Sequence, residues 1–352
     1  MKTENKHYAA LDILKFICAL LVVAIHTAPL IGISDTGNFV LVQIIARLAV
    51  PIFFMCSGYF FFKKMNFRTK DLVVKEDNWI YYKRYIAKLI RIYSVWTLIY
   101  LVIIIVDWIQ GGFNAGSVLR LIRDYFVNGS YYHLWYFPAL IFAISMLYFA
   151  FQHFSKKTIV IASFSLYAIG MLGNVYSGVL EGIPILNKIS SIYTPIFVTT
   201  RNGLFFAMIF VALGALLTMY NLKFKTTACA RLFVISLILM SAEAFILKKF
   251  GIMHDLASMY LFLIPTVLFL FIWVKNINIK GRGMYKGLRI LSVIVYVLHI
   301  FIIRVLNGLL ILLNVSISNL MFYILVVSVC VVIGLVIILL SKKQKMLHYL
   351  YA

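Results

Sequence analysis

Residues 11–31 read LDILKFICALLVVAIHTAPLI, a mostly apolar run with only a few polar side chains. A helix needs about 20 apolar residues to cross a bilayer, and this run has that length. It is too long for the hydrophobic part of a signal peptide, and no small-residue cleavage site follows it. The sequence therefore predicts a membrane helix that the protein retains.

Nine further segments have the same apolar character: 39–62, 92–109, 135–154, 158–174, 202–220, 232–248, 258–274, 290–312 and 320–341. The longest polar stretch, 63–91, is expected to be a loop, and no stretch is left for a soluble domain. The sequence thus predicts an all-α polytopic membrane protein of about ten transmembrane helices. Residues 1–352 are expected to form a single membrane-embedded domain.

The composition excludes several classes of protein. Of 352 residues, 64% are hydrophobic and 12% are charged, and the mean hydropathy is +1.00. A soluble chain is nearer half apolar and a quarter charged, so a soluble enzyme and a disordered chain are both excluded. The four cysteines show no CxxC spacing, and no metal-site cluster, Gly-rich phosphate loop, HExxH or GxSxG occurs. Neither a metal site nor a disulfide framework is expected.

The net charge is +22, from 33 Lys and Arg against 11 Asp and Glu. In a soluble protein this excess would suggest nucleic acid. When the N-terminus is placed in the cytoplasm, however, 24 of the 33 basic residues fall on the cytoplasmic side and 6 outside. The positive-inside rule therefore predicts cytoplasmic termini in a membrane of bacterial type, and no nucleic-acid partner. The remaining three basic residues, Lys15, Arg47 and Arg304, lie within predicted spans.

The first span carries two ionisable side chains on one face. Lys15 and His26 are eleven residues apart, which is about 1100° of helix rotation, roughly 20° past three turns, and about 16 Å along the axis. Asp12 precedes Lys15 by one turn. Ionisable residues within a bilayer are functional candidates. Alternatively, Lys15 extends to the cytoplasmic headgroups and His26 makes one interhelical hydrogen bond.

Two other spans carry polar residues. Arg47 lies mid-helix, where it needs a partner or a wet cavity, and Pro51 and Gly58 after it favour a break and close packing. Tyr296 and His299 share a face of the ninth span. His299 could orient His26, shuttle a proton, bind substrate or make a structural hydrogen bond.

Two outer segments are rich in polar and aromatic residues: 131–138 (YYHLWYFP) and 199–206 (TTRNGLFF). Trp and Tyr at a span boundary usually form an aromatic belt, which explains Tyr136. His133 and Arg201 are not required by a belt, so they are candidates for binding. Glu243, an acid in the outer half of a span, could pair with Arg304 or Arg47 or lie at the outer interface.

Several motifs together resemble a known family. Lys15-x10-His26, residues 53–59 (FFMCSGY) and Tyr296-x-x-His299 are similar to signatures of the acyltransferase-3 family of membrane acyltransferases. That family has ten helices and cytoplasmic termini, in agreement with the charge distribution. A closer similarity is to the membrane half of the vancomycin-resistance membrane-bound serine racemases. It rests on 45–51 (IARLAVP), 132–136 (YHLWY), 200–203 (TRNG), His254-Asp255 and 258–260 (SMY).

The chain departs from these relatives in two places. The family usually has Arg at the position of Lys15, and Lys retains the charge but loses the bidentate fork for phosphate. The racemases continue into a soluble pyridoxal-phosphate domain, whereas this sequence stops at Ala352. Racemisation is therefore not expected.

The resemblance implies an O-acyltransferase without a permanently bound cofactor. An acyl group, with acetyl as the expected one, would pass from acetyl-CoA or another cytosolic acyl-CoA to an extracytoplasmic carbohydrate or other hydroxyl acceptor. His26 would act as general base or transient acyl carrier, and Arg47 would stabilise the oxyanion or position the substrate. Lys15 and Arg91 would hold the donor. The expected acceptor-side residues are His133, Trp135, Arg201, Tyr296 and His299.

Two other functions stay open at this point. The charged residues and histidines of the spans could form the relay of a small-molecule transporter, for example one for L-serine. Against this, the sequence has no clear internal repeat of the kind that many transporters show. A sensor or scaffold without turnover is the third possibility.

Overall fold

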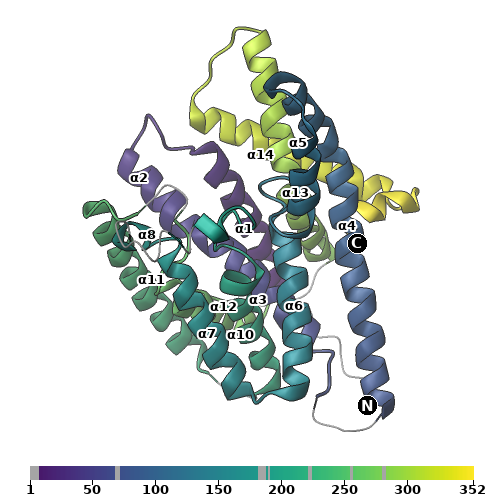
Figure 1. The fold of residues 1–352 in the computed structure, drawn as a ribbon, viewed down its shortest axis with the longest axis vertical. Coiled ribbons are helices and arrows are strands. Elements are labelled where there is room, and N and C mark those ends of the chain that lie inside the picture. Colours follow the sequence, from purple (N-terminus) through teal and green to yellow (C-terminus); the bar gives the residue numbers. More distant parts are fainter. Residues whose placement is uncertain are drawn as a thin grey trace. The chain divides into compact units, whose positions relative to one another are not determined.

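A computed structural model describes residues 8–67, 72–180, 188, 191–220, 224–253, 257–279 and 283–352 of the chain. These residues form helices joined by turns and loops, and no strand occurs among them (Figure 1). The predicted all-α fold is confirmed. The helices group into two compact units, and the chain passes from one to the other after residues 53, 222, 241 and 261, so that α3 (Ala49–Phe62) and α11 (Thr226–Lys249) each contribute to both.

Seven helices in the described part of the chain are long and apolar enough to cross a membrane: Ala9–Thr27, Asp35–Phe62, Val73–Gly111, Tyr136–His153, Thr226–Lys249, Tyr285–Leu312 and Asn319–Leu340. The three other predicted spans coincide with shorter helices: Lys156–Leu172, Gly203–Met219 and Leu263–Asn276. The chain is therefore a polytopic membrane protein. Ten spans and cytoplasmic termini stay predictions.

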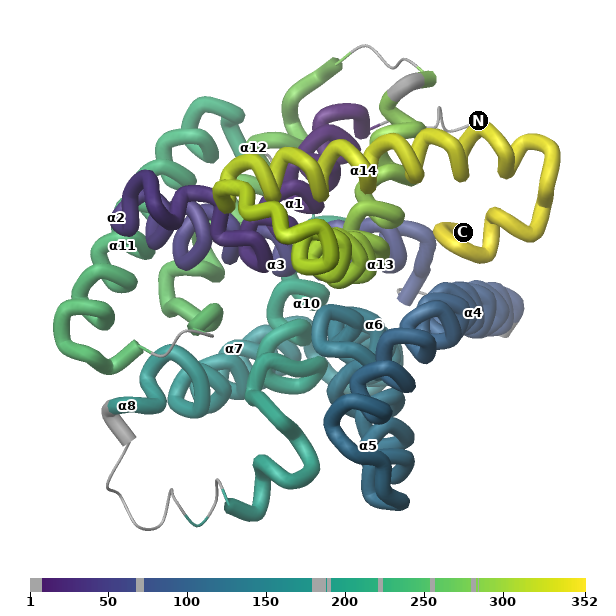
Figure 2. The backbone as a smooth tube through the Cα atoms, turned by 90° about the horizontal axis from the view of Figure 1, so that it is seen from above, coloured from purple at the N-terminus to yellow at the C-terminus, as the bar shows by residue number. Residues whose placement is uncertain are grey.

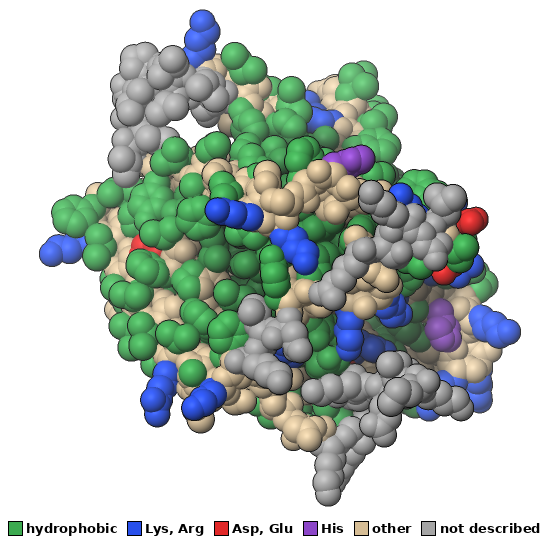
Figure 3. Space-filling view, turned by 90° about the horizontal axis from the view of Figure 1, so that it is seen from below, with side chains coloured by type: hydrophobic (Ala, Val, Ile, Leu, Met, Phe, Trp, Pro, Cys, Tyr) green, Lys and Arg blue, Asp and Glu red, His purple; other side chains and the backbone are tan. Residues whose placement is uncertain are grey.

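Apolar side chains cover much of the surface. Only 17% of the most apolar 18-residue stretch of α14 (Asn319–Leu340) is buried, and only 28% of the corresponding stretch of α11. In the view of Figure 3 the visible side chains are mostly hydrophobic, and most of the charged ones are Lys or Arg. Such surfaces are stable against lipid tails and not against water.

The first unit is built around α1 (Ala9–Thr27). It also contains α2 (Asp35–Phe39), η1 (Val40–Ile45), η2 (Ala46–Leu48), α12 (Leu263–Asn276), α13 (Gly283–Leu312), α14 and η4 (Lys345–Leu350). Helix α1 packs against α13, α14, α12 and the η1–η2 segment, and α1, α13 and α14 lie side by side in Figure 2. The end of α1 is fixed by the Asn319 amide, which donates to the carbonyl oxygens of Thr27 (3.3 Å) and Ala28 (3.2 Å).

The second predicted span is not a regular α-helix. A π-helical stretch (η1) and a 3₁₀ turn (η2) precede α3. The irregular backbone that Pro51 favours lies in the turns before the proline. Pro51 is in the first turn of α3, where its missing N–H costs little, and its ring disfavours a regular α-turn at Arg47, four residues earlier.

The second unit contains α4 (Leu72–Gly111), α5 (Ala115–Phe126), α6 (Tyr136–His153), α7 (Lys156–Leu172), α8 (Ser177–Leu180), η3 (Gly203–Ala207) and α10 (Met208–Met219). Helices α6, α7 and α10 pack together, as Figure 1 shows. Two glycines bring α3 and α10 close. Gly58 lies against the backbone of Val211, and Gly214 lies against the backbone of Met55. This confirms the predicted close packing at Gly58.

The prediction of a loop over 63–91 is wrong for most of its length, because α4 runs as one helix from Leu72 to Gly111. Residues 72–91 contain no Gly or Pro and are rich in good helix formers, so a polar composition does not prevent a helix. Aromatic packing within the second unit supports the polar N-terminal half of α4. The ring of Tyr82 stacks on Tyr148 of α6 at a centroid distance of 4.5 Å, and Trp79 stacks on Tyr82 at 5.3 Å.

A methyl group at Gly58 would overlap the Val211 backbone, so Gly58→Ala is expected to lower the free energy of unfolding by about 1–3 kcal/mol. Gly308→Ala in α13 is the matched control, because a Cβ at Gly308 has no heavy atom within 4 Å. The control is expected to be neutral or slightly stabilising. Tryptophan fluorescence during unfolding in detergent measures both, and equal stability of the two variants would contradict the packing.

Candidate functional site

The N-terminal half of the predicted histidine face carries an ion pair. Lys15 Nζ lies 2.6 Å from Asp12 Oδ1, with side-chain exposures of 12% and 5%. An unpaired charge at this degree of burial would be costly, and the acid one turn earlier offsets that cost. Lys15 is therefore held in place by Asp12, and its positive charge is shared with the carboxylate.

Two histidines meet at the other end of this face. The rings of His26 on α1 and His299 on α13 have centroids 5.2 Å apart and an angle of 38° between their planes. His26 is half-buried and His299 is fully buried. His299 Nδ1 lies 3.2 Å from the carbonyl oxygen of Val295. Because a carbonyl can only accept, this contact favours the tautomer with the proton on Nδ1.

Tyr296 adds an aromatic wall beside the histidines. Its ring centroid lies 6.1 Å from His299 and 5.9 Å from Phe53. The structure thus brings together three of the predicted residues, His26, Tyr296 and His299, within the first unit.

Arg47 is buried in η2, which packs against α1. Its guanidinium donates through Nε and Nη2 to Gln43 Oε1, with an Nε–Oε1 distance of 3.0 Å. Gln43 was not among the residues singled out from the sequence. Gln43 lies four residues before Arg47 and therefore on the same helix face, so this spacing could have identified it as the partner.

Arg201 and Trp135 form the second group of predicted residues, in the second unit. The Arg201 guanidinium carbon lies 5.0 Å from the centroid of the Trp135 ring, within cation–π range. Trp135 also contacts Phe54 and Phe206, each at a centroid distance of 5.9 Å. His133 is buried between Tyr100 (4.8 Å) and Tyr131 (6.0 Å).

Asn202 fixes the backbone next to Arg201. Its side chain accepts from the backbone N–H groups of Leu204 and Phe205, and its amide donates to the Tyr193 hydroxyl at 2.7 Å. Burial raises the pKa of Tyr193 to about 12. Its hydroxyl therefore stays protonated at neutral pH and donates to the carbonyl oxygen of Thr199. An Asn before an apolar helical run is a recognisable capping signal.

Tyr136 is more than a belt residue. Its hydroxyl lies 3.1 Å from Ser57 Oγ, and its ring stacks on Phe54 at 4.7 Å.

Arg91, the second predicted donor-binding residue, is exposed on α4, and its Nη2 donates to the backbone carbonyl of Ala352 at 2.8 Å.

Glu243 has neutral hydrogen-bond donors. The Tyr176 hydroxyl donates to Glu243 Oε1 at 2.7 Å, and the Leu261 backbone N–H donates to the same oxygen at 2.8 Å. Asn174 Oδ1 accepts from the backbone N–H of Ser258 (2.8 Å) and Met259 (3.1 Å). These contacts anchor the segment from 258 to 261. His254 and Asp255 lie outside the described residues.

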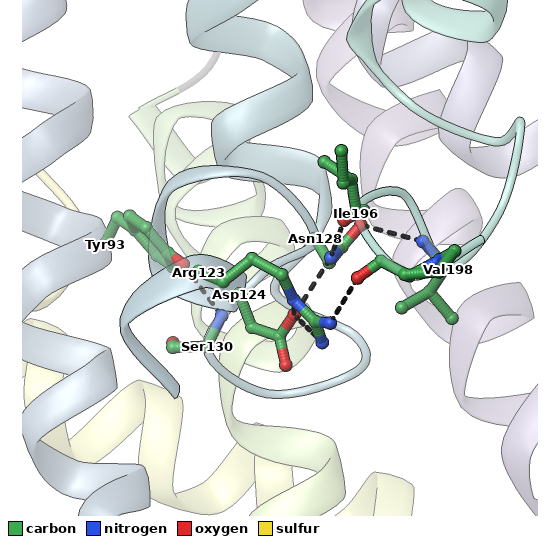
Figure 4. A network of polar contacts seen from close by, with 8 residues as sticks. Tyr93, Arg123, Asp124, Asn128, Ser130, Ile196 and Val198 are labelled. Carbon is green, nitrogen blue, oxygen red and sulfur yellow. Dashed lines mark hydrogen bonds and ion pairs between the residues drawn. The ribbon is translucent and has the colours of Figure 1, made fainter. Parts of the chain in front are cut away.

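A polar contact set, which we call the latch, joins the end of α5 to residues 195–198 (Figure 4). Arg123 Nη1 donates to the Pro195 carbonyl at 2.7 Å. The Asn128 side chain donates to the Ile196 carbonyl (3.0 Å) and accepts from the Val198 N–H (3.2 Å), as a peptide group would in a sheet. Asp124 accepts from both Arg123 and Asn128. The latch therefore ties together the two chain segments that lead to Trp135 and Arg201.

Comparison with known families supplies the classification. The family described as acyltransferase domain matches residues 8–339. The chain belongs to the acyltransferase-3 family. The recognition of that family from the sequence motifs is confirmed, and it supports a membrane acyltransferase in general. No solved structure matches the chain significantly.

The chain is also similar to curated bacterial proteins. Two Enterococcus faecalis proteins named amino-acid racemase are 35% and 32% identical to it, over 82% and 97% of this chain and 38% and 47% of their own lengths. A serine/alanine racemase of Enterococcus gallinarum is 33% identical, over 95% of this chain and 46% of its own length. The chain thus spans less than half the length of these relatives.

Asn128→Ala removes the two hydrogen bonds that Asn128 makes with the backbone of Ile196 and Val198, so hydrogen exchange at the Val198 amide is expected to accelerate roughly tenfold. Hydrogen–deuterium exchange with peptide mass spectrometry measures this. Asn114→Ala is the matched control, because Asn114 caps the start of α5 by accepting from the N–H and the hydroxyl of Ser117. Unchanged exchange across 195–200 in Asn128→Ala would mean that the latch does not hold this segment.

Proposed function

We propose that this protein transfers an acyl group, acetyl in the first instance, from cytosolic acyl-CoA to a hydroxyl of an extracytoplasmic carbohydrate or similar acceptor. It would do so in the bacterial cytoplasmic membrane. The observation that carries the proposal is the contact between His26 and His299, at 5.2 Å between centroids, in a bundle of the acyltransferase-3 family. A half-buried imidazole beside a second one suits general-base catalysis near neutral pH.

In this proposal His26 takes the proton of the acceptor hydroxyl as its oxygen attacks the thioester carbonyl. The carbon–sulfur bond then breaks, and the CoA thiolate receives the proton from His26. His299 acts as a positioning residue, because its ring contacts His26 and its own Nδ1 is oriented by Val295. Arg47, in a segment that packs against α1, would supply positive charge for the oxyanion or position a substrate.

The remaining residues would bind the two substrates. Lys15 and Arg91 would provide positive charge for the anionic donor, although Lys15 shares its charge with Asp12. Trp135 with Arg201 offers an aromatic face and a guanidinium, a combination that suits a sugar acceptor. His133 and Tyr296 would complete the acceptor-binding residues of their respective units.

The names of the relatives favour a second candidate function. Because those proteins are named serine/alanine and amino-acid racemases, the chain could instead move a small amino acid such as L-serine across the membrane. The polar residues of the first unit would then serve as a substrate path rather than as a catalytic centre.

Loss of the general base is expected to reduce acyl transfer by about 10²–10⁴-fold. His26→Ala should therefore lower the acetyl content of envelope glycans, measured by mass spectrometry of cells that depend on this protein. His153→Ala, an exposed histidine at the end of α6, is the control and should match the wild type. Unchanged acetylation in His26→Ala, with equal protein levels, would remove His26 from the catalytic role.

Donor binding separates the two candidate functions. The purified protein should bind labelled acetyl-CoA, and the double variant Asp12→Asn/Lys15→Gln should bind it several-fold more weakly. The double variant avoids leaving a buried Asp12 without its cation. Absence of coenzyme binding to the wild type, together with serine accumulation in proteoliposomes, would reject the transferase and favour the transporter.

A further inference from the structure

A cavity of about 570 Å³ lies within the second unit, where three helix ends meet. The end of α3 and the residues after it contribute Phe62, Lys63 and Phe67; the α6–α7 connection contributes Phe151 and Lys156; and α10 contributes Thr218. Cavities of this volume hold small molecules and cofactors.

The chemistry of the lining suits a phosphorylated ligand with a planar group. Two lysines and no acid are among the described lining residues. Three phenylalanine rings cluster in the wall, with centroid distances of 5.2 Å between Phe62 and Phe151 and 6.0 Å from Phe67 to each of them. Aromatic rings stack on a purine base, and lysine ammonium groups bind phosphate.

The wall of the cavity is fixed by hydrogen bonds and not only by packing. The buried Asn78 of α4 accepts from the Asn66 N–H at 3.2 Å and donates to the Asn66 carbonyl at 2.8 Å. Asn66 itself lines the cavity, and its side-chain amide is an additional polar group of the lining. The lining is therefore ordered on the α4 side before any ligand arrives.

The predicted orientation places all three helix ends on the cytoplasmic side, where acyl-CoA is found. We infer that this cavity binds the purine nucleotide and phosphates of the acyl-CoA donor, an inference that rests on the proposed function. Lys63 and Lys156 would contact the phosphates, and the phenylalanine cluster would contact the base.

An anionic lipid headgroup also carries a phosphate, but it has no planar base that could stack on the phenylalanine rings. The experiment therefore measures CoA binding to the full chain in nanodiscs of zwitterionic lipid and of lipid containing phosphatidylglycerol. Lys63→Gln/Lys156→Gln is compared with Lys64→Gln/Lys157→Gln, which removes the same charge from the adjacent positions that do not line the cavity. Thermal unfolding verifies that both double variants are folded. Phe67→Ala tests the base contact.

CoA affinity should fall about tenfold in Lys63→Gln/Lys156→Gln and less than about twofold in the control pair. Phe67→Ala should weaken CoA several-fold and leave the binding of pantetheine, which lacks the nucleotide, unchanged. Equal CoA affinity in the two double variants would overturn the inference and leave the transferase intact. An effect of the cavity variants confined to retention of phosphatidylglycerol would also overturn it. If wild-type protein binds no CoA, the proposed function fails together with the inference.

Discussion

A polar group inside an apolar helix bundle must find a partner, because neither lipid tails nor packed side chains replace the water it loses. This constraint accounts for the polar contacts of both units. Lys15 is paired with Asp12 one turn earlier, and Arg47 with Gln43 one turn earlier. Glu243 instead draws donors from other segments, the hydroxyl of Tyr176 and a backbone N–H.

The partner of each group also limits what the group can do. Lys15 shares its charge with a carboxylate, so the sequence-based role of holding an anionic donor is weaker for Lys15 alone than spacing suggested. The histidines are different. His299 is oriented by a backbone carbonyl and faces His26, which is an arrangement that can control a proton.

Close packing supplies the rigidity that such polar contacts need. Gly58 and Gly214 let α3 and α10 approach to backbone contact in the second unit. A tight interface restricts the rotamers of the side chains beside it. Ser57, adjacent to Gly58, is thereby held within hydrogen-bond distance of Tyr136.

The sequence by itself determined the apolar helices, because the length of an apolar run and the 3.6-residue period are local properties. It also determined that Lys15 and His26 share a face of one helix, and its motifs were enough to recognise the family. Only the tertiary structure decided which distant groups meet. The contact of His26 with His299, the binding of Asn128 to residues 196–198 and the cavity at three helix ends all join segments far apart in the chain. The helical form of residues 72–91 was also decided by the tertiary structure. Its aromatic support comes from α6, and a local sequence pattern does not reveal a packing partner.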